Sequence, residues 1–393
     1  MNSKLAASKI GKKIAIAVFT GLLFLPAALF AVRGVTGKRA DVSLKGYFDE
    51  ITIPDINRES ILNGSFQSGF ADWLSSNFPP RGVFIKTYNS IKLDLFRLGN
   101  NIIGKDKYIF EYAYVSSELM LEPKNNLAIT ESREQMRDYV DKLQAIDSAL
   151  KERGKGFVFY ISASKADECR DHLPKSYLVQ EAKLGQRSVD CLKEMLLMTD
   201  INWFYTPDLV SELPCQPFYA TGIHWSRPFE QKVTLEVLNR VSQETGKTYR
   251  TWELTDLKKS DKPFGRDADL YDTLNVWDKH FDDEYYEYDT VNVIPEEYSN
   301  LNILMQGGSF AHGVWGDVWK HYPEEDIQYI NYCEYLYNKD KEFTVLGNDW
   351  NNLPLQELVD NADCLVIEIN EAVISNYSNG YVDQLYDYLC GEK

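Results

Sequence analysis

Histidine is scarce in this chain: five histidines occur among 393 residues. Few side chains can therefore serve as a base near neutral pH. The six cysteines are widely spaced and none of them forms a C-x-x-C pair, so a zinc or thioredoxin-like site is not expected. We expect no metal and no cofactor. The cysteine spacing leaves open whether the thiols are buried and free or paired in disulfides.

Basic residues are also fewer than acidic residues. Lysine and arginine number 42 against 59 aspartate and glutamate residues, which gives a formal net charge of -17. Nucleic acid binds to basic surfaces, so we expect no nucleic-acid partner. Hydrophobic residues make up 44% of the chain and aromatic residues 13%, which is typical of a packed globular protein. We find no internal repeat, and the length suggests one large domain with an N-terminal region.

The N-terminal region contains a charge-free stretch of 19 residues, Ile14 to Val32, which suffices to cross a bilayer. Basic residues flank it on both sides, so the positive-inside rule gives only a slight preference for a cytoplasmic N terminus. No small-x-small cleavage site closes the stretch. We therefore expect an uncleaved signal anchor rather than a cleaved signal peptide. In either case residues from about 40 onward would lie outside the cytoplasm.

Periodic apolar residues predict helices that alternate with strands. The clearest helix runs from Glu131 to Arg153, where apolar residues recur every three or four positions until Gly154. The other expected helices lie at 81–98, at 177–197, after Ser226 and at the C terminus, and residues 103–110 are expected to form a strand or a hairpin. Further strands are expected at 156–161, 201–205, 301–305, 326–332 and 364–369. This alternation predicts an α/β domain with a mostly parallel sheet, and residues 250–298 read as an irregular insertion or a hairpin near the site.

Polar residues gather where the strands end, and in a parallel sheet the carboxyl ends of the strands face the active site. Lys165, Ser309 and the segment Glu368-Ile369-Asn370-Glu371 fall there. Ser309 follows Gly307 and Gly308. Glycines at a strand end allow a sharp turn that exposes the serine hydroxyl and directs a backbone N–H at an oxyanion. The sequence therefore predicts Ser309 as a nucleophile.

His224 is the candidate base for this serine. A serine hydroxyl becomes a good nucleophile when a base takes its proton, and histidine is the usual base. His224 stands beside Gly222 and Trp225, directly before an expected helix. His312 lies three residues after Ser309 and competes for the role, but we interpret it as an exposed residue at the start of a helix.

The group that would orient the histidine is missing near it. A carboxylate usually fills this role. Thr221 and Gly222 precede His224, and neither carries a carboxylate. The hydroxyl of Thr221, a backbone carbonyl or a distant acid could replace it. Glu368 and Glu371 are candidates by their position at a strand end, with helix capping or a surface ion pair as their alternative roles.

Six short motifs follow one another over roughly residues 60 to 390. They are Asn77-Phe78-Pro79-Pro80-Arg81, Ile103-Gly104-Lys105-Asp106-Lys107-Tyr108-Ile109-Phe110, Ser162-Ala163-Ser164-Lys165, His224-Trp225-Ser226, Gly307-Gly308-Ser309-Phe310 and Ile367-Glu368-Ile369-Asn370-Glu371. In order and spacing they resemble the SGNH-hydrolase-like proteins related to the alginate O-acetyltransferases. The family pattern carries an aspartate where this chain has Gly222, and Gly-Asp-Ser where it has Gly307-Gly308-Ser309.

The resemblance implies a three-layer SGNH-like domain with a mostly parallel sheet, permuted so that the histidine precedes the serine, and preceded by one transmembrane helix. We expect a cytoplasmic tip and signal anchor at 1–40, a connector and N-terminal part at 41–115 that packs on the core, and the catalytic domain at 116–393. The resemblance also implies that Ser309 carries an acetyl group and that His224 is its base. The residues expected to shape the oxyanion site or its surroundings are Gly308, Thr221, Lys165, Glu368, Asn370 and Glu371.

The resulting expectation is a membrane-anchored, extracytoplasmic enzyme that acetylates hydroxyls of an exported or cell-surface polysaccharide. A multi-pass membrane acyltransferase partner would supply the acetyl group. One alternative is an O-acetylesterase that uses the same serine. A second alternative is a non-catalytic carbohydrate-binding scaffold of a polymer export complex, motivated by the missing carboxylate.

Overall fold

A computed structural model of the chain describes residues 2–37, 41–46, 51–96, 101–118, 130–178, 186–277, 283–340 and 342–391. The chain divides into two compact units. One is formed by residues 1–100 and 272–280, and the other by residues 101–271 and 281–393. The candidate site residues identified from the sequence all belong to the second unit.

The first unit is helical. Its helices are α1 (Asn2–Thr36), α2 (Arg58–Leu62), α3 (Ser65–Asn77) and α4 (Arg81–Phe96). The expected helix at 81–98 corresponds to α4, and its last two positions lie outside the described residues. Asp41 accepts a hydrogen bond from the backbone N–H of Gly82 (3.0 Å) and so caps the first turn of α4. Trp277 donates its indole N–H to Thr87 (2.9 Å), which ties a segment distant in sequence to the same helix.

The charge-free stretch Ile14–Val32 lies in α1. Among the residues that the structure describes, no single helix has both the length and the hydrophobicity to cross a membrane. The consecutive segments Gly11–Leu25 and Ala27–Thr36, with a bend of 41° between them, meet both requirements together by length and composition.

A seven-stranded sheet forms the centre of the second unit. Its strands are β3 (Gly156–Ser162), β4 (Asn202–Tyr205), β7 (Asn302–Gly307), β8 (Asp326–Asn331), β9 (Tyr335–Tyr337), β10 (Phe343–Val345) and β11 (Cys364–Asn370). Their order is β10-β9-β8-β7-β11-β3-β4. The strands from β8 to β4 are parallel, whereas β9 and β10 extend the sheet antiparallel. The prediction of an α/β class with a mainly parallel sheet is confirmed.

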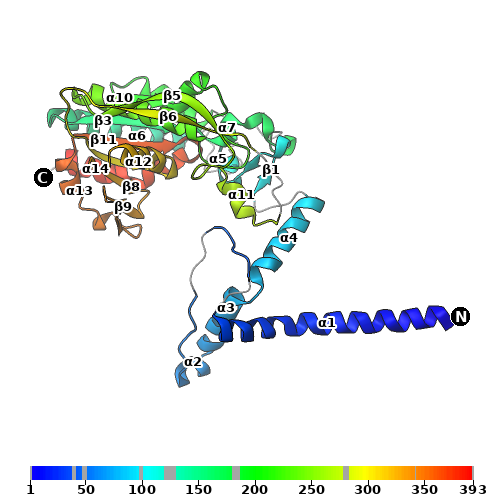
Figure 1. Cartoon of the computed structure of the whole chain (residues 1–393). Coiled ribbons are helices and arrows are strands. Elements are labelled where there is room, and N and C mark those ends of the chain that lie inside the picture. The colour runs from blue at the N-terminus through cyan, green and yellow to red at the C-terminus, as the bar shows by residue number, and fades with distance from the viewer. Residues whose placement is uncertain are drawn as a thin grey trace. The chain divides into compact units, whose positions relative to one another are not determined.

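Helices pack on both faces of this sheet (Figure 1). One face carries α6 (Thr130–Glu152), α9 (Ser188–Leu196), α13 (Leu355–Asn361) and α14 (Tyr381–Cys390), and the other carries α10 (Arg227–Thr245) and α12 (Ser309–His321). Phe157 and Phe159 of β3 pack in the first layer, whereas Val158 and Tyr160 pack in the second. Side chains of a strand alternate in this way, and every residue of β3 is buried, as in a parallel sheet covered on both sides.

Residues 250–298 contain a hairpin, which is one of the two expected arrangements. Its strands, β5 (Thr251–Ser260) and β6 (Tyr285–Val293), are antiparallel, and α11 (Asp269–Leu274) lies between them in sequence. Gln231 of α10 donates its amide to the carbonyl of Tyr288 and accepts the N–H of the same residue, both at 2.9 Å. The hairpin is thereby bonded to α10, beside which it runs in Figure 1.

The smaller elements test the remaining predictions. Residues 103–110 were expected to form a strand or a hairpin, and the structure shows a hairpin of β1 (Ile102–Ile103) and β2 (Ile109–Phe110). The continuous helix expected at 177–197 is wrong: α8 (Lys175–Leu178) and α9 are separate, and residues 179–185 lie outside the described residues. Arg187 is extended (φ -66°, ψ 148°), so a new helix starts at Ser188. The other short elements are α5 (Tyr112–Glu118), α7 (Lys165–Glu168) and the 3-10 helices Lys105–Lys107, Arg170–His172, Thr206–Glu212, Trp350–Asn352 and Glu371–Gly380.

Candidate active site

The serine lies on a turn between β7, which ends at Gly307, and α12, which begins at Ser309. Gly308 is the N-cap with φ of -90°, a backbone conformation open to any residue. The expectation that the glycines serve a sharp turn is therefore corrected, because close packing requires them instead. A Cβ at Gly307 would lie 2.7 Å from Glu368 Oε2, and one at Gly308 would lie 2.8 Å from the hydroxyl of Tyr332.

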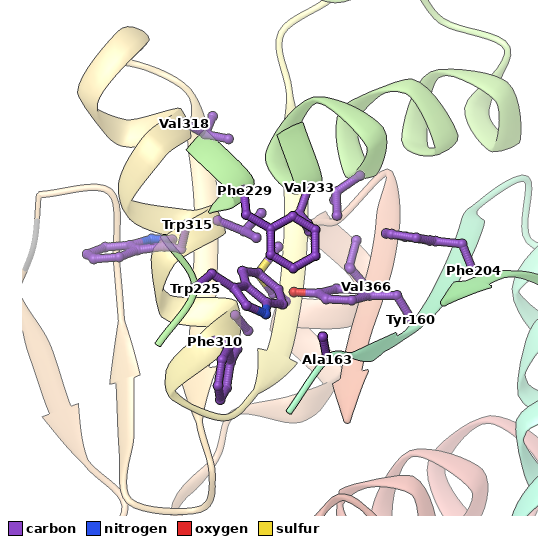
Figure 2. Packing of buried hydrophobic residues seen from close by; sticks show 14 of the residues in the cluster. Tyr160, Ala163, Phe204, Trp225, Phe229, Val233, Phe310, Trp315, Val318 and Val366 are labelled. Carbon is purple, nitrogen blue, oxygen red and sulfur yellow. The ribbon is translucent and has the colours of Figure 1, made fainter. Parts of the chain in front are cut away.

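The structure brings Ser309 and His224 together. The Oγ atom of Ser309 lies 2.8 Å from Nε2 of His224. The residues that follow them, Phe310 and Trp225, are both buried, and their ring centroids lie 5.1 Å apart. Figure 2 shows these two rings side by side in the core. Protein interiors are closely packed, so these buried rings have little room to move, and their contact holds the backbone that carries both functional side chains.

The other ring nitrogen of His224 faces Asp269, the first residue of α11. Nδ1 lies 2.5 Å from Oδ2 of this carboxylate. Its second oxygen, Oδ1, accepts the backbone N–H groups of Ile223 and Leu270, each at 2.8 Å, which hold the carboxylate in one orientation. Asp269, His224 and Ser309 thus form one chain of hydrogen bonds with the geometry of a catalytic triad. The missing carboxylate comes from the segment between β5 and β6, and sequence reasoning did not find it.

Gly222 is the position where the family pattern carries the aspartate. A Cβ at Gly222 would lie 2.4 Å from the backbone carbonyl oxygen of Asp267. This approach leaves no room for a side chain unless the loop before His224 moves. The carboxylate therefore reaches the imidazole from a different segment of the chain, which itself packs against Gly222.

Lys165 supports the same loop from within the core. Its Nζ donates to the carbonyl oxygens of Ile109 (2.7 Å), Ala220 (2.8 Å) and Gly222 (2.7 Å), so all three ammonium hydrogens have acceptors. Burial lowers the pKa of Lys165 to about 7. Lys165 thus holds the backbone at Ala220 and Gly222, and His224 lies two residues after Gly222.

Burial also has the largest influence on the pKa of His224, which lies below its usual value, while the hydrogen bond with Asp269 opposes the shift. For Asp269, burial raises the pKa, but the hydrogen bonds from His224 and from the N–H groups of Ile223 and Leu270 outweigh it, and the pKa is lowered. At neutral pH the pair is therefore a neutral imidazole beside a carboxylate. In this state His224 can accept the hydroxyl proton of Ser309.

Glu368 and Glu371 were expected as possible partners of His224, but the structure gives them other partners. Glu368 accepts the N–H of Gly308 (2.7 Å) and the hydroxyl of Ser162, and burial raises its pKa to about 7. Glu371 accepts the N–H of Ser164 at 2.6 Å. Both carboxyl groups are buried, which excludes the alternative of a surface ion pair.

Asn370 and Thr221 also act away from the imidazole. Asn370 donates its amide to the hydroxyl of Ser162 (2.9 Å) and the carbonyl of Ala163 (3.0 Å), which joins the ends of β11 and β3. Thr221 bonds to the carboxylate of Asp283 through its N–H (2.9 Å) and its hydroxyl. These residues shape the walls and loops of the site and leave the orientation of His224 to Asp269.

Two residues that the sequence did not single out contact the backbone of Ser309. Arg266 donates from Nη1 to the carbonyl oxygen of Ser309 (2.7 Å). The N–H of Ser309 donates to the hydroxyl of Tyr332 at 3.2 Å. Ser309 also opens α12, whose N-terminal dipole favours negative charge at this point. A positively charged side chain and the N-terminus of a helix therefore lie close to the atom that would attack a carbonyl carbon.

One cavity adjoins the serine turn, and another lies beside His224. The larger one, of about 300 Å³, includes His224, Arg266 and His312 in its lining. The smaller one, of about 20 Å³, includes Gly308, Phe310 and Tyr332. The site therefore has a large cavity beside His224 and a very small cavity beside Gly308. In the described part of the chain, no group of three or more His, Cys, Asp or Glu side chains is placed to hold a metal ion.

Comparison with known proteins finds weak structural similarity. No family model and no curated protein match the sequence. Among solved structures, AlgX of Pseudomonas aeruginosa is 15% identical, with a TM-score of 0.41 over 77% of this chain and 71% of AlgX. The O-acetyltransferase domain of Pseudomonas putida AlgJ is 14% identical, with a TM-score of 0.40 over 74% of this chain and 100% of the domain. Bacillus cereus PatB1 is 10% identical, with a TM-score of 0.36 over 62% of this chain and 91% of PatB1. These values do not assign the chain to a family.

His312 does not compete for Ser309. It is half-buried rather than exposed, and its ring lies within 5.3 to 5.8 Å of the rings of Trp315, Tyr329 and Tyr337. Nε2 of His224 is already at hydrogen-bond distance from the serine. His312 therefore forms part of the wall of the larger cavity.

All six cysteines lie among the described residues, and each is a free thiol. Four of them, Cys169, Cys191, Cys333 and Cys364, are buried. Of the two arrangements left open by the sequence, the structure shows the unpaired one. The hairpin and the sheet are therefore held by packing and hydrogen bonds rather than by cross-links.

Proposed function

We propose that the chain is an acyltransferase that carries an acetyl group on Ser309 and passes it to hydroxyl groups of a polysaccharide outside the cytoplasm. The observation that carries the proposal is the hydrogen-bonded series Ser309–His224–Asp269 at 2.8 and 2.5 Å. A serine at a strand-to-helix turn, with a neutral histidine and an ionised carboxylate in line, is an arrangement for acyl transfer.

The reaction would run in two steps through a covalent intermediate. In the first, His224 takes the proton of Ser309 as Oγ bonds to the acyl carbon, and the donor leaves with that proton. In the second, His224 takes a proton from the acceptor hydroxyl, whose oxygen bonds to the same carbon while the Ser309 ester bond breaks. The proton returns to Oγ. Asp269 keeps Nδ1 protonated and stabilises the imidazolium in both steps.

The small cavity favours a short acyl group. Its volume of about 20 Å³ exceeds only slightly the space needed for one water-sized group. Gly308, Phe310 and Tyr332 line it, so an acyl chain bound to Ser309 in this direction meets the turn and two rings. The methyl group of an acetyl ester is close to this size, so we expect esters of longer acyl chains to be poorer substrates.

The acceptor, the location and the partner rest on the sequence. The six motifs resemble enzymes that acetylate exported polysaccharides, and the charge-free stretch Ile14–Val32 would anchor the enzyme at a membrane. We propose that a multi-pass membrane protein delivers the acetyl group to Ser309 and that no cofactor is required. The larger cavity beside His224 would admit a sugar hydroxyl from solvent.

An O-acetylesterase is the second candidate, because water can replace the sugar in the second step without any change to the triad. The scaffold alternative loses its motive, since it was based on the absence of a carboxylate at His224. Asp269 supplies that carboxylate at 2.5 Å from Nδ1.

The test uses the full chain in detergent. A fluorophosphonate probe should label the wild type and the control Ser148→Ala, which changes an exposed serine of α6, but not Ser309→Ala. Hydrolysis of p-nitrophenyl acetate should exceed that of the hexanoate ester. Acetyl transfer to an oligosaccharide, measured against release of acetate, then separates transferase from esterase. A folded wild type that is neither labelled nor active on the ester would overturn the proposal.

A further inference from the structure

Tyr332 occupies an unusual position beside the serine turn. It directly follows β8, the strand next to β7, and its φ of 52° lies in the left-handed region that residues with a side chain rarely adopt. Its N–H donates to the carbonyl of Gly307 at 2.9 Å. Strained backbone of this kind persists where surrounding contacts hold it, and it is frequent at functional sites. Here the contacts with Gly307, Gly308 and Ser309 hold the phenol ring against the turn.

The hydroxyl of Tyr332 lies beside the N–H group to which an acyl oxygen would be expected to bond. It accepts the N–H of Ser309 at 3.2 Å, and this N–H belongs to the residue that would attack the substrate. The same hydroxyl packs on Gly308, where a Cβ would lie 2.8 Å from it. In serine proteases, the backbone N–H of the nucleophilic serine is one of the donors to the carbonyl oxygen that becomes negatively charged. The phenol oxygen therefore lies beside that position in the resting structure.

Two other donors near the turn are engaged elsewhere. The N–H of Gly308 is held by Glu368 at 2.7 Å. The side-chain amide of Asn370 is bonded to Ser162 and Ala163. Among these described groups, an oxyanion would find the N–H of Ser309 and lack a second donor, whereas oxyanion sites usually provide more than one.

Tyr332 can provide that second donor. Its side chain also has hydrogen bonds with the side chains of Tyr114 and Ser309. A phenol oxygen that accepts a hydrogen bond still has its own O–H to donate. Tyr332 also lines the small cavity that we assign to the acyl methyl group, whereas Arg266 lines the larger cavity on the histidine side. The methyl group and the carbonyl oxygen are bonded to the same carbon, so a donor at the edge of the small cavity is in reach of the oxygen.

We propose that Tyr332 is a catalytic residue whose phenol O–H donates a hydrogen bond to the oxyanion formed on the acyl carbon, together with the N–H of Ser309. The inference rests on the proposed acyl transfer. The acyl oxygen would enter between the two groups and replace their mutual hydrogen bond. The phenol keeps its proton throughout, and the proton of Ser309 goes to His224. Burial raises the pKa of Tyr332, so the side chain is a neutral donor at neutral pH.

The test compares two tyrosines that bond to the same turn. Tyr332→Phe removes the proposed donor, and Tyr329→Phe removes a hydroxyl that donates to the carbonyl of Gly308 at 2.6 Å. Loss of one oxyanion donor lowers kcat about 10²- to 10³-fold in a characterised protease. We expect a loss of this order for Tyr332→Phe on p-nitrophenyl acetate, with little change in KM, and a much smaller loss for Tyr329→Phe. The inhibition constant of methylboronic acid, which forms a tetrahedral adduct with serine, should rise in Tyr332→Phe only.

The outcomes separate this inference from the proposed function. Wild-type activity that depends on Ser309, combined with an unchanged kcat in a folded Tyr332→Phe variant, overturns the inference and leaves the acyl transfer standing. A faster Tyr332→Phe variant also overturns it, because the hydroxyl would then obstruct the oxyanion position. If the variant does not fold, 3-fluorotyrosine at position 332 keeps the ring and makes the O–H more acidic. A rise in kcat is then expected, and an unchanged kcat counts against the inference.

Discussion

Replacement of Asp269 by asparagine should nearly abolish acyl transfer through a change of histidine tautomer. Oδ1 of Asp269 accepts two backbone N–H groups, from Ile223 and Leu270. An asparagine would keep its carbonyl oxygen at these donors and therefore direct its NH₂ group at Nδ1 of His224. Nδ1 would then have to be an acceptor, and the ring proton would move to Nε2. His224 would donate to the hydroxyl of Ser309 instead of accepting its proton.

The expected magnitude follows from the role of this carboxylate. The equivalent change in a serine protease triad lowers kcat about 10⁴-fold with the geometry intact. Each factor of ten corresponds to about 1.36 kcal/mol of activation free energy, so the loss is about 5.4 kcal/mol. We expect a similar loss in the rate at which the Asp269→Asn variant is acylated by p-nitrophenyl acetate, measured as the burst of p-nitrophenol. KM should be nearly unchanged because Asp269 lies behind the imidazole.

The matched control is Asp272→Asn, which changes an exposed carboxylate on the same short helix. It should retain wild-type kinetics. Thermal unfolding of both variants shows whether the fold is kept. A folded Asp269→Asn protein whose kcat lies within about tenfold of the wild type would refute the assignment of Asp269 as the triad acid, since a wrong tautomer costs far more than that.

Two further predictions concern the same loop. In the pH profile of wild-type kcat/KM, the fall in rate on the acid side should be centred below pH 6.5, the ordinary pKa of histidine. The reason is that burial lowers the pKa of His224 and that the neutral imidazole is the base. A fall centred above pH 6.5 in the hydrolysis profile would contradict this. Gly222→Asp should lower the unfolding temperature and should not restore activity to Asp269→Asn, because its Cβ would lie 2.4 Å from the carbonyl of Asp267. Gly222→Ala should lower the unfolding temperature as well, and a fully stable alanine variant would show that the loop gives way.

Much of the sheet could be predicted because its strands are short apolar runs that are buried on both faces. Such runs are recognisable locally, and parallel pairing then brings their carboxyl ends to one edge. From the amino-acid sequence alone, that reasoning places Ser309, Lys165 and Glu368 near one another. The same reasoning also applies to Tyr332, since the expected strand at 326–332 ends on it. Only its left-handed backbone and its contact with the N–H of Ser309 distinguish it from other tyrosines, and neither is visible in sequence.

The continuous helix at 177–197 was wrong for a local reason. Apolar spacing extends across the region, but Arg187 adopts an extended conformation that no periodicity reveals. The strands β9 and β10 were missed because their residues are exposed or half-buried and lie at the edge of the sheet. Patterns of buried residues predict central strands better than edge strands.

The acid of the triad was beyond prediction because nothing local distinguishes it. Residues 250–298 contain many carboxylates, and which of them meets His224 depends on how the hairpin β5–β6 docks on α10. When the hairpin is docked, residues 266–269 make three contacts with the site. Arg266 bonds to the carbonyl of Ser309, the backbone of Asp267 packs on Gly222, and Asp269 bonds to His224. Gly222, which replaces the aspartate of the family pattern, is thus the residue against which the segment carrying Asp269 packs. The absence of a carboxylate at position 222 and the presence of Asp269 beside His224 depend on each other. A side chain at position 222 would push away the backbone that brings Asp269 to the imidazole.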